Sequence, residues 1–454
     1  MSTVIESSSG VAETGDAGAQ GRPTTALTIG QLFQISVFWL TLNAIWGGFE
    51  IFQQERVDQL LGKDAPPAIG VMDLLAAPIA MLGMPVCGSI SDYAATRWGR
   101  RKPFILLGSL TAAAAIVGMA FSSTFVLILT FFLLLQLTSN VARGPFAGLV
   151  PDLVPERQVG TASGLMGLMI MLGLVTGNLI INAGYLLGSP EHADFTVPLV
   201  AIATLVAVTG VGTFLWIPNG PAPKPREGRS WPRLALETFG TDILQERSYV
   251  FLLASRFFVL MGGGFFMNLN VLFLKGAFGF EEAADRGPWV FAGSVVGVAA
   301  AALGTIPGGK LSDRVGRKPV IYASAVLGAI GIAIIGLAPV PEVAIAGVAV
   351  LGLGSGAFLA VDWALMTDII PKASAGRYMG ISNIVEALNG AVASALGMFT
   401  LFFVGMAFGD VVGARTAMLL GVAVFAAGAA FLVPVREPQR QRPGRPLAGI
   451  PQHA

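Results

Sequence analysis

The sequence predicts an all-α membrane protein with twelve transmembrane helices in two pseudo-symmetric bundles of six. Three observations lead to this prediction. Hydrophobic residues make up 54% of the 454 residues and charged residues only 12%, whereas a soluble domain carries about 25% charged residues. The apolar residues fall into twelve stretches, each about as long as the ~20 residues that a helix needs to cross the hydrocarbon layer. Finally, two charged motifs recur at nearly the same offset along the chain, which indicates two related halves.

The apolar stretches divide as six and six around a polar connection. The first six give an expected N-terminal bundle over 29–217, with spans at 29–52, 69–90, 103–122, 124–150, 160–186 and 196–217. The last six give an expected C-terminal bundle over 249–434, with spans at 249–274, 288–311, 319–339, 342–366, 376–404 and 413–434. Pro and Arg are frequent in 218–248, which predicts a linker, and the polar residues 1–28 and 435–454 predict tails. Residues 1–27 lack the basic start and apolar core of a secretory signal peptide.

The distribution of Lys and Arg predicts the orientation. With both termini inside, 21 of the 28 basic residues lie in cytoplasmic segments, 5 lie outside and 2 lie within spans. Such a bias follows the positive-inside rule and predicts a multi-pass protein of the cell (inner) membrane with cytoplasmic tails and linker. The net charge is only +1, so nothing indicates a nucleic-acid partner.

The repeat is carried by two pairs of loops. The stretch "GSISDYAATRWGRRKP" returns as "GGKLSDRVGRKP", and Gly99 and Gly316 are 217 positions apart. A second pair, "PDLVPERQVGTASG" and "TDIIPKASAGRYMG", places Asp152 and Asp368 at an offset of 216. Two matches at a common offset predict halves that face each other across a central cavity, as in transporters built from repeats.

From Gly309 to Lys318 the chain resembles the loop motif of the major facilitator superfamily, Gly-x-x-x-Asp-Arg-x-Gly-Arg-Lys. The long spacing in "SDYAATRWGRRKPFIL" and the stretch "QLTSNVARGPFAGLVPDL" resemble the branch that holds the sucrose–proton symporters and the glycoside–pentoside–hexuronide cation symporters. This resemblance implies alternating access and uptake of a sugar with a coupling proton or sodium ion. In that branch an acid precedes the Gly-Pro pair by eight residues, where this chain has Gln136, and an Asn corresponds to Asn140. Gln136 cannot exchange a proton, so the coupling mechanism does not transfer unchanged.

The duplicated loops predict a gate at the cytoplasmic rim. A carboxylate beside basic residues at equivalent loops can latch the halves in one state and release them in another, and an Asp can face a helix N-terminus. A plain positive-inside anchor is the alternative, but it explains neither the Asp nor the duplication. The expected gate residues are Asp92, Arg97, Arg100, Arg101, Asp152, Asp313, Arg314, Arg317 and Asp368.

Ionisable residues inside the expected spans are the candidates for the transport site, because each costs at least ~2.5–3.5 kcal/mol at the membrane centre. Glu386 lies about 15 Å into its span; Asn383 and Asn389 flank it, and it is our first choice for the coupling carboxylate. Asp362 is second, because Arg256 in the same half can pair with it. Trp363 beside a carboxylate is typical of a sugar site. Glu50, Asp73 and Arg143 are further intramembrane charges, and Asn43, Gln136, Asn140, Asn178, Asn268 and Asn270 are expected hydroxyl partners.

Two other functions remain open. Efflux of an amphipathic compound predicts an apolar cavity lined by Met and Phe, of which the chain has 15 and 29. A membrane assembly factor or sensor without transport predicts a cavity plugged by large side chains. An enzyme is not predicted, because no Gly-rich loop followed by Lys and Ser or Thr could hold a nucleotide. A single cysteine, Cys87, and two histidines predict no metal site and no cofactor, and we expect a monomer.

Overall fold

The computed structural model describes residues 25–220, 222, 246–369 and 375–435, with the side chains of residues 367, 368, 375–380 and 383 outside the description. Helices are the regular secondary structure of these ranges. The N-terminal helices are α1 (Ile29–Trp46), α2 (Phe49–Leu61), η1 (Gly62–Asp64), α3 (Ala65–Asp92), α4 (Lys102–Ala120), α5 (Phe125–Ala147), α6 (Leu149–Leu153), η2 (Glu156–Gln158), α7 (Val159–Leu187) and α8 (Thr196–Trp216). The C-terminal helices are α10 (Arg247–Phe278), α11 (Ala283–Val315), α12 (Arg317–Leu337), α13 (Pro341–Ile369), α14 (Ala375–Phe408) and α15 (Asp410–Leu432).

The predicted all-α membrane architecture is confirmed. Within the described ranges, 11 helical stretches are long and apolar enough to cross a membrane. The first of them, Ile29–Asp92, has 64 residues, which at a rise of 1.5 Å per residue is about three times the ~30 Å thickness of the hydrocarbon core. Because α2 ends before the short turn η1 and α3 then begins, this stretch comprises two crossings. Most of the predicted linker and both tails lie outside the described residues.

The expected first span, 29–52, is wrong as a single helix. The structure has two helices there, and the break falls at the Gly47–Gly48 pair. A Cβ atom at Gly47 would overlap the backbone carbonyl of Leu174, and one at Gly48 would overlap the side chain of Ile181. The pair therefore permits a close approach of the first crossing to α7, and consecutive glycines are a common place for a helix to bend.

The two motif glycines adopt similar backbone conformations. Gly99 has a φ of +92° and Gly316 a φ of +101°, a region that residues with a Cβ atom rarely adopt. Each lies in the short connection between two crossings, α3 to α4 and α11 to α12. The repeated Gly-Arg therefore places a glycine with positive φ shortly before the next crossing in both parts of the chain.

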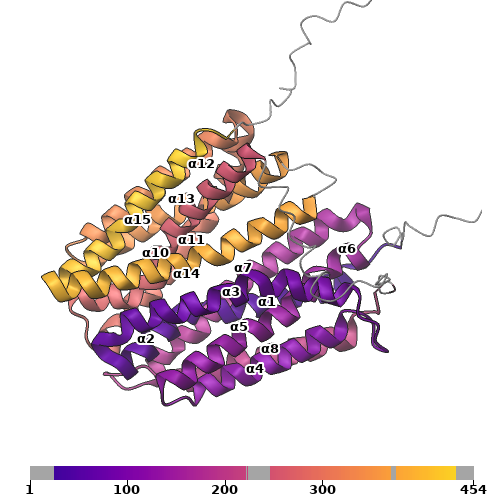
Figure 1. The fold of residues 1–454 in the computed structure, drawn as a ribbon, viewed down its shortest axis with the longest axis horizontal. Coiled ribbons are helices and arrows are strands. Elements are labelled where there is room, and N and C mark those ends of the chain that lie inside the picture. Colours follow the sequence, from indigo (N-terminus) through magenta and orange to yellow (C-terminus); the bar gives the residue numbers. More distant parts are fainter. Residues whose placement is uncertain (1–24, 221, 223–245, 370–374, 436–454) are drawn as a thin grey trace, which may run out of the picture.

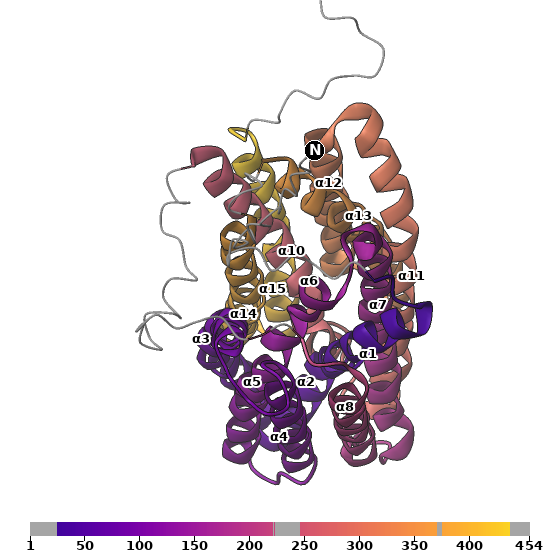
Figure 2. The same ribbon diagram turned by 90° about the vertical axis from the view of Figure 1, so that its right-hand side faces the viewer.

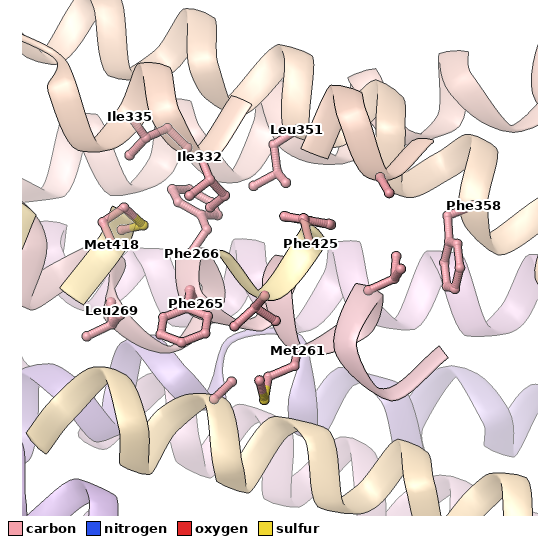
Figure 3. Close-up of a cluster of buried hydrophobic side chains, with 14 of the residues drawn as sticks. Met261, Phe265, Phe266, Leu269, Ile332, Ile335, Leu351, Phe358, Met418 and Phe425 are labelled. Carbon is pink, nitrogen blue, oxygen red and sulfur yellow. The ribbon is translucent and has the colours of Figure 1, made fainter. Parts of the chain in front are cut away.

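Each group of helices packs mainly within itself, as Figures 1 and 2 show. In the N-terminal group α1 packs on α7 and α4 packs on α5 and α8, while in the C-terminal group α13 packs between α11 and α12. The C-terminal core includes the aromatic and aliphatic side chains in Figure 3, among them Phe265, Ile332 and Phe425. Among the described residues, the most extensive contacts between the groups are those of α3 with α14, α2 with α10 and α7 with α11.

Candidate transport site

Polar contacts between the two groups close one end of the bundle. The carboxylate of Glu55 on α2 accepts two hydrogen bonds from Arg286 on α11, from Nε at 2.9 Å and from Nη2 at 2.7 Å. Tyr185 on α7 donates its hydroxyl to the same carboxylate at 2.7 Å. Beside them, Nζ of Lys275 lies 2.8 Å from the carboxylate of Asp58. We call this end, defined by Glu55, Asp58, Lys275 and Arg286, the sealed end.

The sealed end also buries an amide between the groups. Gln54 is 1% exposed, and its Oε1 accepts hydrogen bonds from the backbone N–H groups of Val271 and Leu272 at 3.1 and 3.3 Å. Its Nε2 donates to Oδ1 of Asn270 at 3.3 Å. Because buried amides need such partners, Gln54 ties α2 to the C-terminal third of α10.

A cavity of about 160 Å³ lies between the two groups, next to the sealed end. Helices α1, α2, α3 and α5 line it from the N-terminal group, and α10 and α14 line it from the C-terminal group. Its described lining combines carboxylates, amides, aromatic rings and small residues: Trp46, Phe49, Glu50, Gln53, Asp73, Ala76, Ala77, Ala80, Phe132, Gln136, Asn268, Ala387, Gly390 and Ala391. Such a lining can hold a ligand with both polar and apolar surface.

Asp73 connects the two groups across this cavity. Nε2 of Gln53 on α2 donates to its Oδ1 at 2.8 Å, and the Ser394 hydroxyl on α14 donates to its Oδ2. Close by, a Cβ atom at Gly70 would lie 3.2 Å from the Cα of Ala395. The absence of a side chain at Gly70 therefore brings α3 close enough to α14 for the Asp73–Ser394 hydrogen bond.

Three charged residues meet in the C-terminal group. Nη1 of Arg256 on α10 pairs with Asp362 on α13, and its Nη2 lies 3.0 Å from Oε2 of Glu386 on α14. The side chains of Arg256 and Asp362 are 2% and 1% exposed, whereas that of Glu386 is 51% exposed. Arg256 therefore has one enclosed carboxylate partner and one that solvent can reach.

The sequence analysis also placed Trp363, Asn389 and Asn383 beside these three charged residues. The guanidinium of Arg256 lies 5.5 Å from the ring centroid of Trp363, a cation–π distance. Asn389 donates Nδ2 to the backbone carbonyl of Glu386 at 2.5 Å, so it supports the helix rather than the carboxylate. The side chain of Asn383 lies outside the described residues.

The expected hydroxyl partners are dispersed. Gln136 and Asn268 line the cavity. Asn140 on α5 donates Nδ2 to the backbone carbonyl of Gln136 at 2.8 Å. A Cβ atom at Gly83 on α3 would lie 2.8 Å from the Cβ atom of Asn140, so Asn140 packs between α3 and α5. The other three lie elsewhere: Asn43 donates to the Trp39 carbonyl, Asn178 donates to Ser294, and Asn270 accepts from Gln54.

At the opposite end, the first motif loop forms an ion cluster. Arg100 and Arg101 both pair with Asp152, at 2.6 and 2.7 Å, and Arg101 also lies 2.8 Å from Asp92. The cluster joins the α3–α4 loop to α6 within the N-terminal group. Arg97 does not take part, because it is exposed and its guanidinium lies over the Trp98 ring.

In the second motif loop, Arg317 contacts two residues at the end of α11. Arg317 lies 3.0 Å from Asp313 one helical turn away, and it also donates to the Ser312 hydroxyl at 2.5 Å. Arg314 is exposed. The side chain of Asp368 lies outside the described residues, so the counterpart of the Asp152 contact is not described.

Sequence reasoning missed the sealed end. In the sequence, Lys275 and Arg286 are two of the five basic residues expected outside the membrane, and no role was expected for their partners Asp58 and Glu55. The two members of the Glu55–Arg286 pair are 231 residues apart, and no local pattern links them. A buried charge at the end of a span resembles an ordinary loop charge until the helices are packed.

Known transporters match parts of the sequence. The chain is 30% identical over 92 residues to the minor myo-inositol transporter IolF of Bacillus subtilis, covering 20% of this chain and 21% of that protein. It is 31% identical over 126 residues to the sucrose transport protein SUC3 of Arabidopsis thaliana, covering 23% and 21%. With the lactose permease of Lactobacillus helveticus it shares 29% identity over 187 residues, covering 36% and 28%. The matched stretches thus span less than a third of these relatives.

Solved structures match over most of the chain. A bacterial homologue of the human lysosomal transporter Spinster, inward-facing and unoccupied, superposes with a TM-score of 0.67 at 16% identity, covering 89% of this chain and 95% of that one. The nucleoside transporter NupG gives a TM-score of 0.65 at 13% identity, covering 89% and 98%. These likenesses establish the fold. The family model of the Major Facilitator Superfamily matches residues 26–394, and the chain therefore belongs to this superfamily of membrane transporters.

Proposed function

We propose that the protein is a secondary active transporter that works by alternating access and takes up a sugar or glycoside together with a cation, a proton in our first assignment. The observation that carries the proposal is the cavity between the two helix groups, where carboxylates and amides lie beside aromatic rings. Hydroxyl groups of a sugar need such donors and acceptors, and its apolar face packs on an aromatic ring. The names of the sucrose, inositol and lactose transporters support the same substrate class.

A second candidate is efflux of an amphipathic compound. The rings of Trp46, Phe49 and Phe132 and a set of alanines supply apolar lining to the cavity. Such a ligand would need fewer hydrogen bonds than a sugar, so the amides of Gln53, Gln136 and Asn268 argue for the first candidate.

We assign the coupling cation to Glu386. A coupling carboxylate has to reach water and change its charge during the cycle. Glu386 is half exposed and shares Arg256 with Asp362, which is enclosed. Protonation of Glu386 would leave Arg256 paired with Asp362 alone, so no buried cation would lose its partner.

In the proposed orientation the sealed end faces outward and the motif loops face the cytoplasm, with Asp92, Asp152 and Asp313 in the inner gate. The Lys and Arg distribution supports this orientation. A reporter fused within 218–248 should then give a cytoplasmic signal, and a signal from the other side would overturn the topology.

Uptake into membrane vesicles tests the function. Vesicles holding the protein are given a panel of labelled sugars and glycosides, with and without an inward proton gradient. We expect at least one of them to accumulate above its external concentration only when the gradient is present. Equilibration without accumulation would indicate a facilitator. Gradient-driven export of an amphipathic dye, with no sugar moved in any vesicle, would favour the second candidate.

A further inference from the structure

A second cavity, of about 330 Å³, lies at the sealed end on the N-terminal side of α2. Its described lining comes from α2, α4, α7, α8 and the α7–α8 loop, which all belong to the N-terminal group. The buried rings of Phe52 and Phe195 form part of its wall. Polar side chains line it as well: Arg56, Gln59, Ser189, His192, Asp194 and Thr196. We call it the side cavity, and the transport cycle proposed above gives it no role.

Helix α2 separates the side cavity from the contacts of the sealed end. Phe52, Arg56 and Gln59 follow one another at helical spacing, so they share one face of α2. Glu55 and Asp58 lie on a different face and bind the C-terminal group. A ligand in the side cavity would therefore lie beside the entrance that forms when the sealed end opens.

Hydrogen bonds hold the guanidinium of Arg56 in a fixed position at the side cavity. Its Nη2 donates to the backbone carbonyl of Ser122 at 2.8 Å, and its Nη1 donates to Oε1 of Gln59 at 3.1 Å. Gln59 in turn donates Nε2 to the backbone carbonyl of Ala193 at 3.1 Å. A guanidinium has more N–H donors than these two bonds use, so Arg56 can also donate to a ligand.

The α7–α8 loop brings a carboxylate to the same cavity. Oδ1 of Asp194 accepts a hydrogen bond from the backbone N–H of Thr196 at 2.8 Å. Hydrogen bonds from the backbone and the hydroxyl of Thr196, together with the nearby charge of Arg56, hold the pKa of Asp194 below its ordinary value. Gly188 permits the path of the loop, because a Cβ atom there would overlap the backbone carbonyl of His192. Asp194 is therefore an ionised acceptor on a defined loop.

The combination of these two charges selects the ligand. Among the described contacts, Arg56 and Asp194 form no ion pair with each other, although both line the cavity. A hydroxyl group can accept from a guanidinium and donate to a carboxylate at the same time. A simple anion would be repelled by Asp194 and a simple cation by Arg56. A neutral molecule with several hydroxyl groups satisfies both charges, and its C–H surface can pack on the rings of Phe52 and Phe195.

We propose that the side cavity is a second binding site, outside the transport path, for a neutral polyhydroxylated ligand, a sugar or a polyol. Its role as a capture site for the transported sugar rests on the proposed function. Because its described walls belong to one helix group, the side cavity persists when the two groups separate. It can therefore hold a sugar at the entrance before the sealed end opens.

The α7–α8 loop also borders the opposite group, which places the side cavity at the rim of the entrance. The backbone N–H groups of Ala283 and Ala284, at the start of α11, donate to the carbonyls of Glu191 and Pro190 at 3.3 and 2.9 Å. Opening of the sealed end separates α11 from this loop and exposes the entrance next to the captured ligand.

His192 provides a local probe of binding, because it lines the side cavity and the chain has only one other histidine, His453. His453→Gln leaves a single histidine, whose ring signal can be followed by NMR in histidine-labelled protein in detergent. The protein is titrated with sucrose, lactose and myo-inositol, with inorganic phosphate and glycine as an anion and a zwitterion for comparison. We expect at least one of the three polyhydroxylated compounds to shift the His192 signal in a saturable manner.

Two substitutions in the side cavity and two controls locate the site. Arg56→Gln removes the cation, and Asp194→Asn removes the anion but keeps a side chain that can cap α8. Each should weaken the binding seen at His192 by about tenfold or more, because a hydrogen bond to a charged group is lost. Asp64→Asn, exposed at the same end, and Asn268→Ala, in the cavity between the groups, should leave the titration unchanged.

Uptake kinetics test the capture role. For a sugar that the wild type transports, Arg56→Gln should raise the KM of uptake by roughly three- to tenfold. The kcat should stay unchanged, because the lost contact binds the sugar before it enters the transport path. A fall in kcat at constant KM would overturn the capture role.

The NMR results decide the binding site. No saturable shift of His192 with sucrose, lactose or myo-inositol would overturn it, and so would unchanged titrations in Arg56→Gln and Asp194→Asn. A shift with phosphate or glycine alone would assign the side cavity to a charged ligand and overturn the proposal. Sugar accumulation by wild type without any His192 shift would leave the proposed function intact. A His192 shift in protein that transports no sugar would sustain the binding site while the proposed function fails.

Discussion

The pair between Glu55 and Arg286 should determine how often the sealed end opens. Both side chains are almost fully buried, at 0% and 3% exposed, and two hydrogen bonds join them. Arg286 also donates Nη1 to the backbone carbonyls of Phe280 and Glu281, at 2.8 and 2.6 Å. Alternating access requires this end to open, and opening must separate α2 from α11 and return both charges to water.

The size of the shift in the equilibrium between the closed and the open state follows from the different surroundings of Arg286 in the two states. Removing one member of a buried ion pair costs about 3–5 kcal/mol, because the remaining charge stays buried without its partner. Glu55→Gln should impose this cost on the closed state alone, since in the open state water solvates Arg286. At about 1.4 kcal/mol per factor of ten, the equilibrium moves toward the open state by roughly a hundredfold to a few thousandfold.

Thiol labelling measures this shift. The chain has one cysteine, so Cys87→Ser gives a background in which Val271→Cys, 1% exposed at the α2–α10 contact, is the sole target. We expect Glu55→Gln to accelerate labelling by a membrane-impermeant reagent added on the outer side until the open state predominates. The double variant Glu55→Leu with Arg286→Met should label nearly as slowly as the parent, because apolar residues can replace a buried pair without loss of stability. Equal labelling rates in Glu55→Gln and the parent would refute the reasoning.

Three further predictions concern coupling, gating and packing. Glu386→Gln should abolish gradient-driven accumulation in vesicles but leave sugar exchange, and accumulation that persists would move the coupling acid elsewhere. Asp92→Asn and Asp313→Asn should each reduce turnover while the amount of protein in the membrane stays constant, and wild-type turnover in both would make the motif a topology signal only. Gly144→Ala should lower stability by about 1–3 kcal/mol, because its Cβ would overlap the Met84 carbonyl. Gly164→Ala, inside α7 with no atom within 4 Å of the added Cβ, should keep or raise the melting temperature in detergent, because Ala is the better helix former.

The spans could be predicted because each crossing needs a long apolar run, and the chain interrupts those runs with charged loops. The sequence placed Asp92, Arg101 and Asp152 together among the expected gate residues, and in the structure Arg101 contacts both carboxylates within the N-terminal group. Intramembrane charge drew attention to Arg256, which has carboxylate partners on two other helices. In each case one physical constraint acts directly on these residues: the length of a crossing, the position of a charged loop, or the cost of a charge inside the membrane.

The cavity could not be predicted in the same way. In a soluble helix the apolar stripe shows which face turns inward. A membrane helix is apolar toward its neighbours and apolar toward lipid, so the rotation of α2 and α3 leaves no trace in the sequence. Glu50 and Asp73 were therefore recognised as intramembrane charges without a direction, and it is the packing of α3 on α14 that turns Asp73 toward Ser394.

The count of intramembrane charges gives one reason for a cation partner. Four carboxylates stand against two guanidinium groups inside the membrane, Glu50, Asp73, Asp362 and Glu386 against Arg143 and Arg256. If all were ionised, two negative charges would lack a counter-charge, at a cost of at least ~2.5–3.5 kcal/mol each. Protons, a metal cation or a cationic ligand can each supply the missing charge. Of these, protons fit a cycle in which the donors of each carboxylate change: Glu386 has one guanidinium contact to lose, and Asp73 has one hydroxyl that belongs to the other helix group. Two of the four carboxylates, Asp73 and Glu386, thus lie on α3 and α14, the two helices that must move relative to each other when the transporter changes state.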